Sequence, residues 1–197
     1  INNHLIDESA KPNPLSHYAK AKLAAERLLL DREKDVLIFR LGALFGLGDR
    51  FSRILLDLVV NVLTKKAVFG EPLLVYGGGQ CRPLLHVKDV ARAIYFGITN
   101  NVQGLYNLSN KNYKICDIAE DIMSLLPSAK IHYINTKFED LRNYRVKADA
   151  FRSLGWQPRY DLAFGINEIY RLLTEGRIRT PGDSVYSNTD YIRQKLL

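Results

Sequence analysis

Tyr18 and Lys22 are the residues whose types and spacing most suggest catalysis in this chain. They lie four positions apart, and a helix places such residues on one face, one turn from each other. A lysine ammonium beside a tyrosine stabilises the phenolate, so the tyrosine can take a proton from a sugar hydroxyl near neutral pH. The spacing alone is a weak signal, because many surface helices carry it without any function.

The segments around this pair predict how it is positioned. Asn13 is a suitable N-cap, Pro14 suits a first helical turn, and residues 19–30 are rich in strong helix formers. Residues 35–41 then form a short apolar run, which predicts a buried strand of a parallel sheet. The glycines of residues 42–48 predict a turn. Their spacing does not fit a dinucleotide-binding loop, and no acidic residue ends a second strand at the expected distance.

The remaining sequence alternates between helical and strand patterns, which indicates an α/β fold. Helices are expected at residues 51–66, 115–126 and 161–176, and strands at 73–76, 104–109 and 130–134. The three glycines of residues 77–79, like residues 110–112, predict a turn. Trp156 is expected in the core, Asp89 in the first turn of a helix, and His86 in a packing or hydrogen-bonding role.

Composition sets further bounds on the function. The chain has 197 residues, 47% of them apolar, which suits one ordinary domain or two small ones. No apolar run is long enough to span a membrane. Cys81 and Cys116 match no metal or redox spacing, so we expect reduced thiols, a cytoplasmic protein and no metal site. The net charge of +7 comes from dispersed basic residues, which argues against nucleic acid and fits a cleft for an anionic substrate.

Three segments carry a family resemblance. Residues 8–26, around Tyr18 and Lys22, resemble the active-site segment of the extended short-chain dehydrogenase/reductases, the NAD-dependent nucleotide-sugar epimerases and dehydratases. Residues 75–94 are similar to the family's Gly-x-Gly, Arg and His/Tyr-Val-x-Asp-Val-Ala pattern. Residues 140–158 are similar to its Asp-x-Arg-x-Tyr and Leu-Gly-aromatic-x-Pro pattern. The three occur in the family's order and span nearly the whole chain.

The resemblance implies roles for individual residues. Tyr18 would be the catalytic base, and Lys22 would assist it; both would contact the cofactor, NAD or NADP, with Lys22 on the nicotinamide ribose. Arg82 and Arg142 would hold the diphosphate of a nucleotide-diphosphate sugar, since a guanidinium can donate two hydrogen bonds to phosphate oxygens. Arg145 is a rival for the second position.

Two further positions are assigned to the substrate by the same resemblance. Gln80 lies in the second motif, next to the substrate-binding arginine. Ala43 occupies the position at which the family usually has an asparagine that contacts the substrate. In this chain that contact is therefore absent or is supplied by another residue.

The resemblance also implies a fold, namely the C-terminal part of a Rossmann-type parallel sheet plus a smaller α/β substrate-binding domain. Residues 1–42 and 84–110 would belong to the NAD-binding side, and residues 43–83 and 111–197 to the substrate side. In the family, a glycine-rich dinucleotide loop and a catalytic Ser or Thr precede the tyrosine. This chain begins too close to Tyr18 to contain either, so we expect the isolated chain to bind NAD weakly and to be inactive.

Two classes of function remain open at this point. The first is an enzyme that acts on a nucleotide sugar through a 4-keto intermediate, with a homodimer expected from the resemblance. The second is a non-catalytic protein of the same fold that binds a nucleotide sugar or another partner. The presence of both Tyr18 and Lys22 favours the enzyme, whereas Ala43 leans towards the binding protein. A nucleic-acid-binding role is a distant third.

Overall fold

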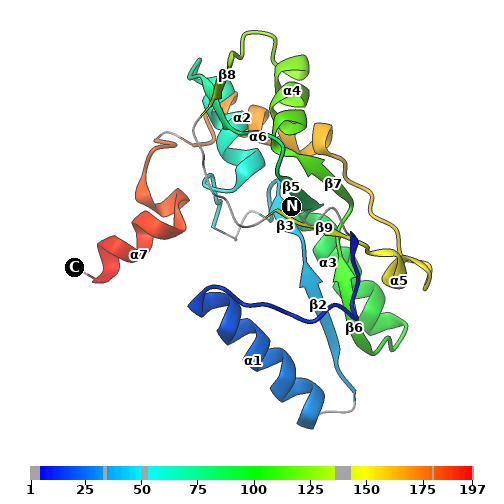
Figure 1. The fold of residues 1–197 in the computed structure, drawn as a ribbon. Helices are drawn as coiled ribbons and strands as arrows, with labels where there is room; N and C mark the ends of the chain where they lie inside the picture. Colours follow the sequence, from blue (N-terminus) through cyan, green and yellow to red (C-terminus); the bar gives the residue numbers. More distant parts are fainter. Residues whose placement is uncertain (1–4, 33–34, 50–52, 136–142, 179, 197) are drawn as a thin grey trace.

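The computed structural model describes residues 5–32, 35–49, 53–135, 143–178 and 180–196 (Figure 1). Its helices are α1 (His17–Arg32), α2 (Val59–Val68), α3 (Val87–Thr99), α4 (Ile115–Leu125), α5 (Asp149–Arg152), α6 (Leu162–Thr174), the 3₁₀ helix η1 (Ser184–Tyr186) and α7 (Asn188–Leu196). Its strands are β1 (Leu5–Ile6), β2 (Leu37–Leu41), β3 (Ala43–Phe45), β4 (Leu73–Tyr76), β5 (Cys81–His86), β6 (Gly104–Leu108), β7 (Lys111–Lys114), β8 (Ile131–Ile134) and β9 (Arg145–Val146).

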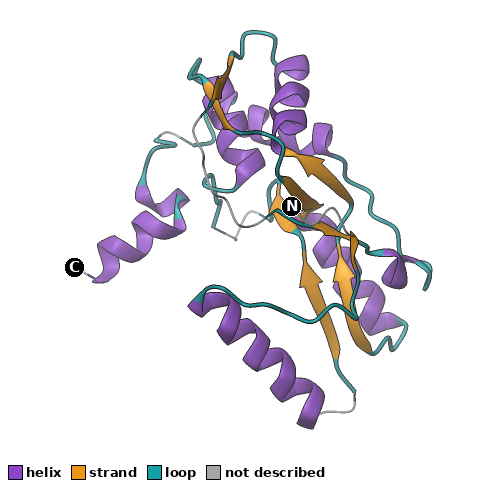
Figure 2. Cartoon of the chain, in the orientation of Figure 1, coloured by secondary structure: helices purple, strands orange, loops and turns teal. Residues whose placement is uncertain are grey.

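The strands pair mostly in parallel. The described pairs are β1 with β9, β2 with β6, β3 with β5, and β4 with β8, all parallel, while β5 and β7 are antiparallel. Figure 2 shows helices packed around these strands, which is the α/β architecture that the sequence predicts. Because parallel neighbours are joined by long crossovers, β2 and β6 meet although more than sixty residues separate them in the chain.

Two hydrophobic cores lie on the two faces of the β3–β5 pair. Leu84 and Phe45 pack into a core formed with α2, α4 and α6, whereas Leu85 and Leu44 pack with α3, α5 and the β2–β6 pair. Neighbouring residues of a strand point to opposite faces, so one short strand can serve both cores. Strands β3 and β5 therefore connect the core that contains α6 with the core that contains the β2–β6 pair.

Several predicted elements are confirmed. The strand predicted at residues 35–41 is β2 and lies in a parallel pair, and β4, β6 and β8 match their predicted segments within a residue or two at each end. Helices α4 and α6 fall within residues 115–126 and 161–176. Trp156 is 3% exposed, as expected of a core residue, and Asp89 lies in the first turn of α3. No helix in the described ranges is long and apolar enough to cross a membrane.

Other predictions are wrong, and each has a physical cause. The predicted turn at residues 42–48 contains β3. Gly42 does not form a turn; its missing side chain lets the backbone lie close to that of Pro83. A Cβ at this position would lie 2.7 Å from the Pro83 carbonyl oxygen. Likewise, the turn predicted at 110–112 overlaps β7, which pairs with β5. The helix predicted at 51–66 begins only at Val59, since residues 53–58 are not helical.

Candidate functional site

Helix α1 holds the predicted dyad, Tyr18 and Lys22, on one face. The helix begins at His17 rather than at Pro14, and its cap is Ser16 instead of Asn13: the Ala19 amide donates to Ser16 Oγ at 3.1 Å. The Lys22 ammonium nitrogen lies 5.5 Å from the centre of the Tyr18 ring. Tyr18 is 73% exposed, so its hydroxyl is accessible to a ligand.

The dyad opens into a hollow between α1 and β2. This hollow has a volume of about 660 Å³, within the range of sites for small molecules. Its lining includes Tyr18, Lys22 and Glu26 from α1, Ile38 and Arg40 from β2, and Tyr144. Tyr144, on the segment that leads into β9, is separated from the dyad by more than 120 positions in the chain, and the sequence did not single it out as a site residue.

The segment that carries Tyr144 is fixed on both sides. On one side, Asn143 Oδ1 accepts a hydrogen bond from the Cys81 amide at 2.9 Å. On the other, the Asn112 side chain donates to the Val146 carbonyl and accepts from its amide, both at 2.9 Å. Side-chain amides that pair with a backbone in this way replace missing strand partners. The position of Tyr144 in the hollow therefore depends on side chains of β7 and on the start of β5.

Of the predicted substrate residues, the three that the structure describes do not line this hollow. Arg82, on β5, is 9% exposed and donates through Nη1 to the Cys81 carbonyl at 2.8 Å. Gln80 donates to the Tyr76 carbonyl at 3.0 Å, while Ala43, on β3, is partly buried against the core that includes α2 and α4. Arg142 lies outside the described residues. Their assignment to the substrate therefore stays a prediction, as does the catalytic role of the dyad.

A second polar cluster surrounds His86, which is fully buried as the last residue of β5. Its Nδ1 accepts from the Lys88 amide at 3.1 Å, so the ring proton lies on Nε2 and is donated to Glu168 Oε2 at 2.8 Å. Glu168 also contacts the Lys88 ammonium and accepts from the Leu47 amide at 3.3 Å. His86 therefore caps α3 and ties it to α6, which confirms the expected hydrogen-bonding role.

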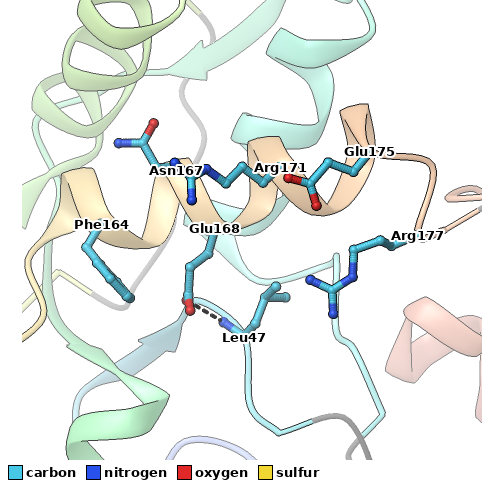
Figure 3. Close-up of a pocket in the computed structure, with 7 residues that line it drawn as sticks. All are labelled: Leu47, Phe164, Asn167, Glu168, Arg171, Glu175 and Arg177. Atoms are coloured by element: carbon cyan, nitrogen blue, oxygen red, sulfur yellow. Dashed lines mark hydrogen bonds between the residues drawn. The ribbon is translucent and has the colours of Figure 1, made fainter.

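Glu168 lies in a groove with a volume of about 590 Å³. Figure 3 shows the residues that line it. The Glu168 carboxylate points from α6 towards the Leu47 amide, and the side chain of Arg177 enters from the segment after α6. The lining consists of Leu47, Phe164, Asn167, Glu168, Arg171, Glu175 and Arg177. None of the predicted site residues that the structure describes is among them, so this groove is distinct from the dyad hollow.

Burial raises the pKa of Glu168, but hydrogen bonds from His86, Lys88 and the Leu47 amide lower it by more, and the net pKa is below its usual 4.5. A carboxylate with a lowered pKa stabilises the fold above pH 4.5, and this contribution is lost as the pH falls through the pKa of the folded state. Glu168→Gln should therefore cost about 1.5–3 kcal/mol of unfolding free energy at pH 7. The difference from the parent protein should shrink below pH 4.5, as measured by urea unfolding.

Glu175→Gln is the matched control for this prediction. Glu175 is exposed in the same groove and should change stability by less than about 0.5 kcal/mol. A loss for Glu168→Gln that stays constant from pH 3 to pH 8 would show that the charge of this carboxylate does not contribute to stability.

The glycine-rich segment after β2 packs closely against His86. Gly46 has a φ of +83°, and a Cβ there would lie 2.0 Å from His86 Nε2. The space beside this glycine is filled by the buried histidine ring. The prediction that this segment is not a dinucleotide loop rests on its glycine spacing. The dyad hollow, by contrast, is open and offers a tyrosine hydroxyl and an ammonium group, which can form hydrogen bonds with a polar ligand.

The parallel strands, the flanking helices and the Tyr-x-x-x-Lys dyad define a Rossmann-like α/β protein. Residues 2–114 match the model of the NAD dependent epimerase/dehydratase family. The chain belongs to this family.

The relatives agree with this assignment. The chain is 33% identical over 181 residues to dTDP-glucose 4,6-dehydratase of Escherichia coli, a match that covers 83% of this chain and 49% of that enzyme. The chain thus spans about half the length of the curated relatives it matches.

Solved structures give the same fold. MoeE5, in complex with UDP-glucose and NAD, has 26% identity and a TM-score of 0.69; the match covers 89% of this chain and 61% of MoeE5. UDP-glucuronic acid 4-epimerase from Bacillus cereus, in complex with UDP-glucuronic acid and NAD, has 21% identity and a TM-score of 0.72. There the match covers 87% of this chain and 57% of the epimerase, and at this identity it supports the fold alone.

Proposed function

We propose that this chain forms the part of an NAD-dependent enzyme that carries the catalytic dyad and binds a nucleotide-diphosphate sugar. The observation that carries the proposal is the dyad itself: Tyr18 and Lys22 share one face of α1 and open into a hollow of about 660 Å³. The reaction would oxidise a sugar hydroxyl, usually at C4, to a 4-keto intermediate. Epimerisation or dehydration would follow.

Each residue has a defined task in this reaction. The hydroxyl of Tyr18, as phenolate, takes the proton from the sugar hydroxyl, and the positive charge of Lys22 stabilises the phenolate. Lys22 would also hold the nicotinamide ribose. NAD, when bound, would supply the hydride acceptor for the sugar carbon that becomes the ketone. Arg82 and Arg142 would fix the diphosphate, so that the sugar is presented to Tyr18 in a productive orientation.

The proposed division of labour runs along the chain in alternating segments. Residues 1–42 and 84–110 would form the NAD-binding side, and residues 43–83 and 111–197 the substrate side. A cytoplasmic location is supported by two cysteines that form no disulfide. NAD is favoured over NADP because solved relatives contain NAD. A homodimer stays part of the proposal.

The alternative is a non-catalytic binding protein with the same fold. It is favoured by Ala43, which replaces the family's usual asparagine and is partly buried against the core rather than exposed in the dyad hollow. Such a protein would bind a nucleotide sugar without consuming it.

The direct test uses the complete protein as its cell makes it. We expect turnover of a dTDP- or UDP-sugar with NAD, with a keto sugar or a C4 epimer as the product by mass spectrometry and NMR. Stoichiometric binding of the nucleotide sugar with no product, in the presence of NAD, would instead favour the binding protein.

The isolated 197-residue chain should behave differently. The described residues provide no loop for the pyrophosphate of NAD. Helix α1 buries none of its residues and exposes Leu28, Leu29 and Leu30 by 43–50%. We therefore expect NAD binding too weak to saturate, negligible turnover and a tendency to self-associate, measured by calorimetry, coupled assay and sedimentation. Oxidation of a nucleotide sugar by this chain alone would contradict the expectation.

A further inference from the structure

We propose that Arg40 is a positioning residue for the catalytic dyad, and this inference rests on the proposed function of Tyr18 and Lys22. Arg40 lies on β2, beside the hollow that the dyad lines. Its Nε donates to Glu26 Oε2 at 2.9 Å, and its Nη2 donates to Glu26 Oε1 at 2.7 Å. This two-point contact joins the strand to α1 at the residue one helical turn after Lys22.

Helix α1 has little else to fix its position. None of its 16 residues is buried, and the space between it and β2 is a hollow rather than packed side chains. Within the described part of the chain, Glu26 is the α1 residue whose side chain is hydrogen-bonded to another element. Because two parallel hydrogen bonds fix both distance and orientation, the pair sets the rotation of α1, and with it the direction in which Tyr18 and Lys22 point.

Arg40 also contacts the segment before α1. Its Nη1 donates to the Glu8 carbonyl at 3.1 Å, while the Glu8 carboxylate accepts from the Asn107 amide on β6 at 2.8 Å. The Asn107 side chain in turn donates to the Lys147 carbonyl at 3.1 Å, directly after β9. Arg40 thus belongs to a network that connects the dyad helix with the segment that carries Tyr144, on the opposite wall of the hollow.

The ion pair is partly shielded from water, which strengthens it. The side chains of Arg40 and Glu26 are 26% and 14% exposed, respectively. At such a site the planar guanidinium cannot be replaced by a lysine ammonium, which keeps the charge but lacks the paired donors. Arg40→Lys therefore preserves the net charge and removes the orientation that the pair imposes.

The test uses the complete protein with a nucleotide sugar that it turns over. Arg40→Lys and Glu26→Gln should each lower kcat by about tenfold or more, because a displacement of the order of 1 Å at reacting groups has effects of that size. The KM for the sugar should change by less than about threefold, since neither residue holds the diphosphate in the proposed function. The double variant should lose no more than either single variant, because both substitutions break the same contact.

Arg92→Lys is the matched control. Arg92 forms an equally short ion pair with Asp89, at 2.7 Å, but on α3, and it also donates to the Gln157 carbonyl. A general loss of stability would appear in both lysine variants. Only Arg40→Lys should lower kcat and accelerate amide hydrogen exchange along α1, and the exchange measurement needs neither substrate nor cofactor.

The outcomes separate this inference from the proposed function. Equal kcat values for Arg40→Lys and Arg92→Lys, together with unchanged exchange in α1, would overturn the positioning role. If Tyr18→Phe keeps full activity, the proposed function fails, and exchange in α1 then decides alone whether Arg40 fixes the helix.

Discussion

Tyr18→Phe in the complete protein should lower kcat by roughly 10²–10⁴-fold, the range typical of a lost general base. The variant lacks the hydroxyl that takes the proton from the sugar, whereas the ring that contacts Lys22 remains. Tyr18 is 73% exposed, and its hydroxyl forms no hydrogen bond within the described ranges, so the fold should be unaffected. Steady-state kinetics and thermal unfolding on the same preparation would check both statements.

Tyr95→Phe is the matched control, because Tyr95 is similarly exposed, at 70%, but lies on α3 outside the dyad hollow. It should keep the activity of the parent protein. A complete protein in which both tyrosine variants are equally active would not use Tyr18 as its base. If the same protein bound nucleotide sugars with unchanged affinity and formed no product, the binding-protein alternative would be the better description.

The dyad and its helix were predictable because their signal is local. Helical spacing, helix-forming residues and a short apolar run determine α1 and β2 without reference to the rest of the chain. The start of the helix was less predictable, since Asn13, Ser16 and Pro14 all suit a helix N-terminus, and only the structure shows that Ser16 is the cap. The first residue of a helix depends on the path of the preceding segment, which is set by its contacts with the rest of the fold.

Features that depend on distant pairing could not be predicted from local patterns. Strands β1 and β9 are two residues each and exist because they pair with each other, although Leu5 and its partner Arg145 are far apart in the chain. Gly42 lets the chain pass from pairing with β6 to pairing with β5, where Pro83 is too close for a side chain. A glycine cluster in sequence does not distinguish such a close approach from a turn.

The same limit applies to the candidate site. No local pattern in the sequence places Tyr144 across the hollow from Tyr18, because its segment is positioned by the pairing of β9 with the distant β1. The sequence contains one indication that Arg40 forms an ion pair. A charged residue within an apolar strand is expected to have a partner of opposite charge. The sequence does not identify that partner as Glu26. Glu168 is a similar case, since its contacts with His86 and Lys88 join segments 80 or more residues apart.

Phe151→Ala should destabilise the fold by about 3–5 kcal/mol, the largest effect on stability that we expect from a single substitution. Phe151, on α5, is fully buried, and its ring centre lies 4.9 Å from that of Phe39 on β2 and 5.3 Å from that of Tyr106 on β6. Phe96 and Trp156 complete the surrounding rings, at 5.7 and 5.5 Å. Alanine would remove the ring that all four contact and leave a cavity.

The measurement is urea unfolding of the parent and variant proteins at neutral pH. The midpoint should fall while the slope of free energy against urea stays constant, because the surface exposed on unfolding is nearly unchanged. Phe151→Leu should lose less than Phe151→Ala, since it leaves a smaller cavity. Phe69→Ala is the control: Phe69 is 51% exposed after α2 and should change stability far less.

The location of Phe151 also predicts an effect on function. Helix α5 follows β9 closely, and Phe151 anchors it against β2, the strand that carries Arg40. Under conditions in which the variant is still folded, weaker anchoring should loosen the segment of Tyr144 and raise the KM for the nucleotide sugar. An unchanged KM combined with the expected loss of stability would mean that the hydrogen bonds from Asn112 and to Asn143 suffice to hold this wall of the hollow. The core would then determine whether the protein folds, and the polar contacts would determine the geometry of the site.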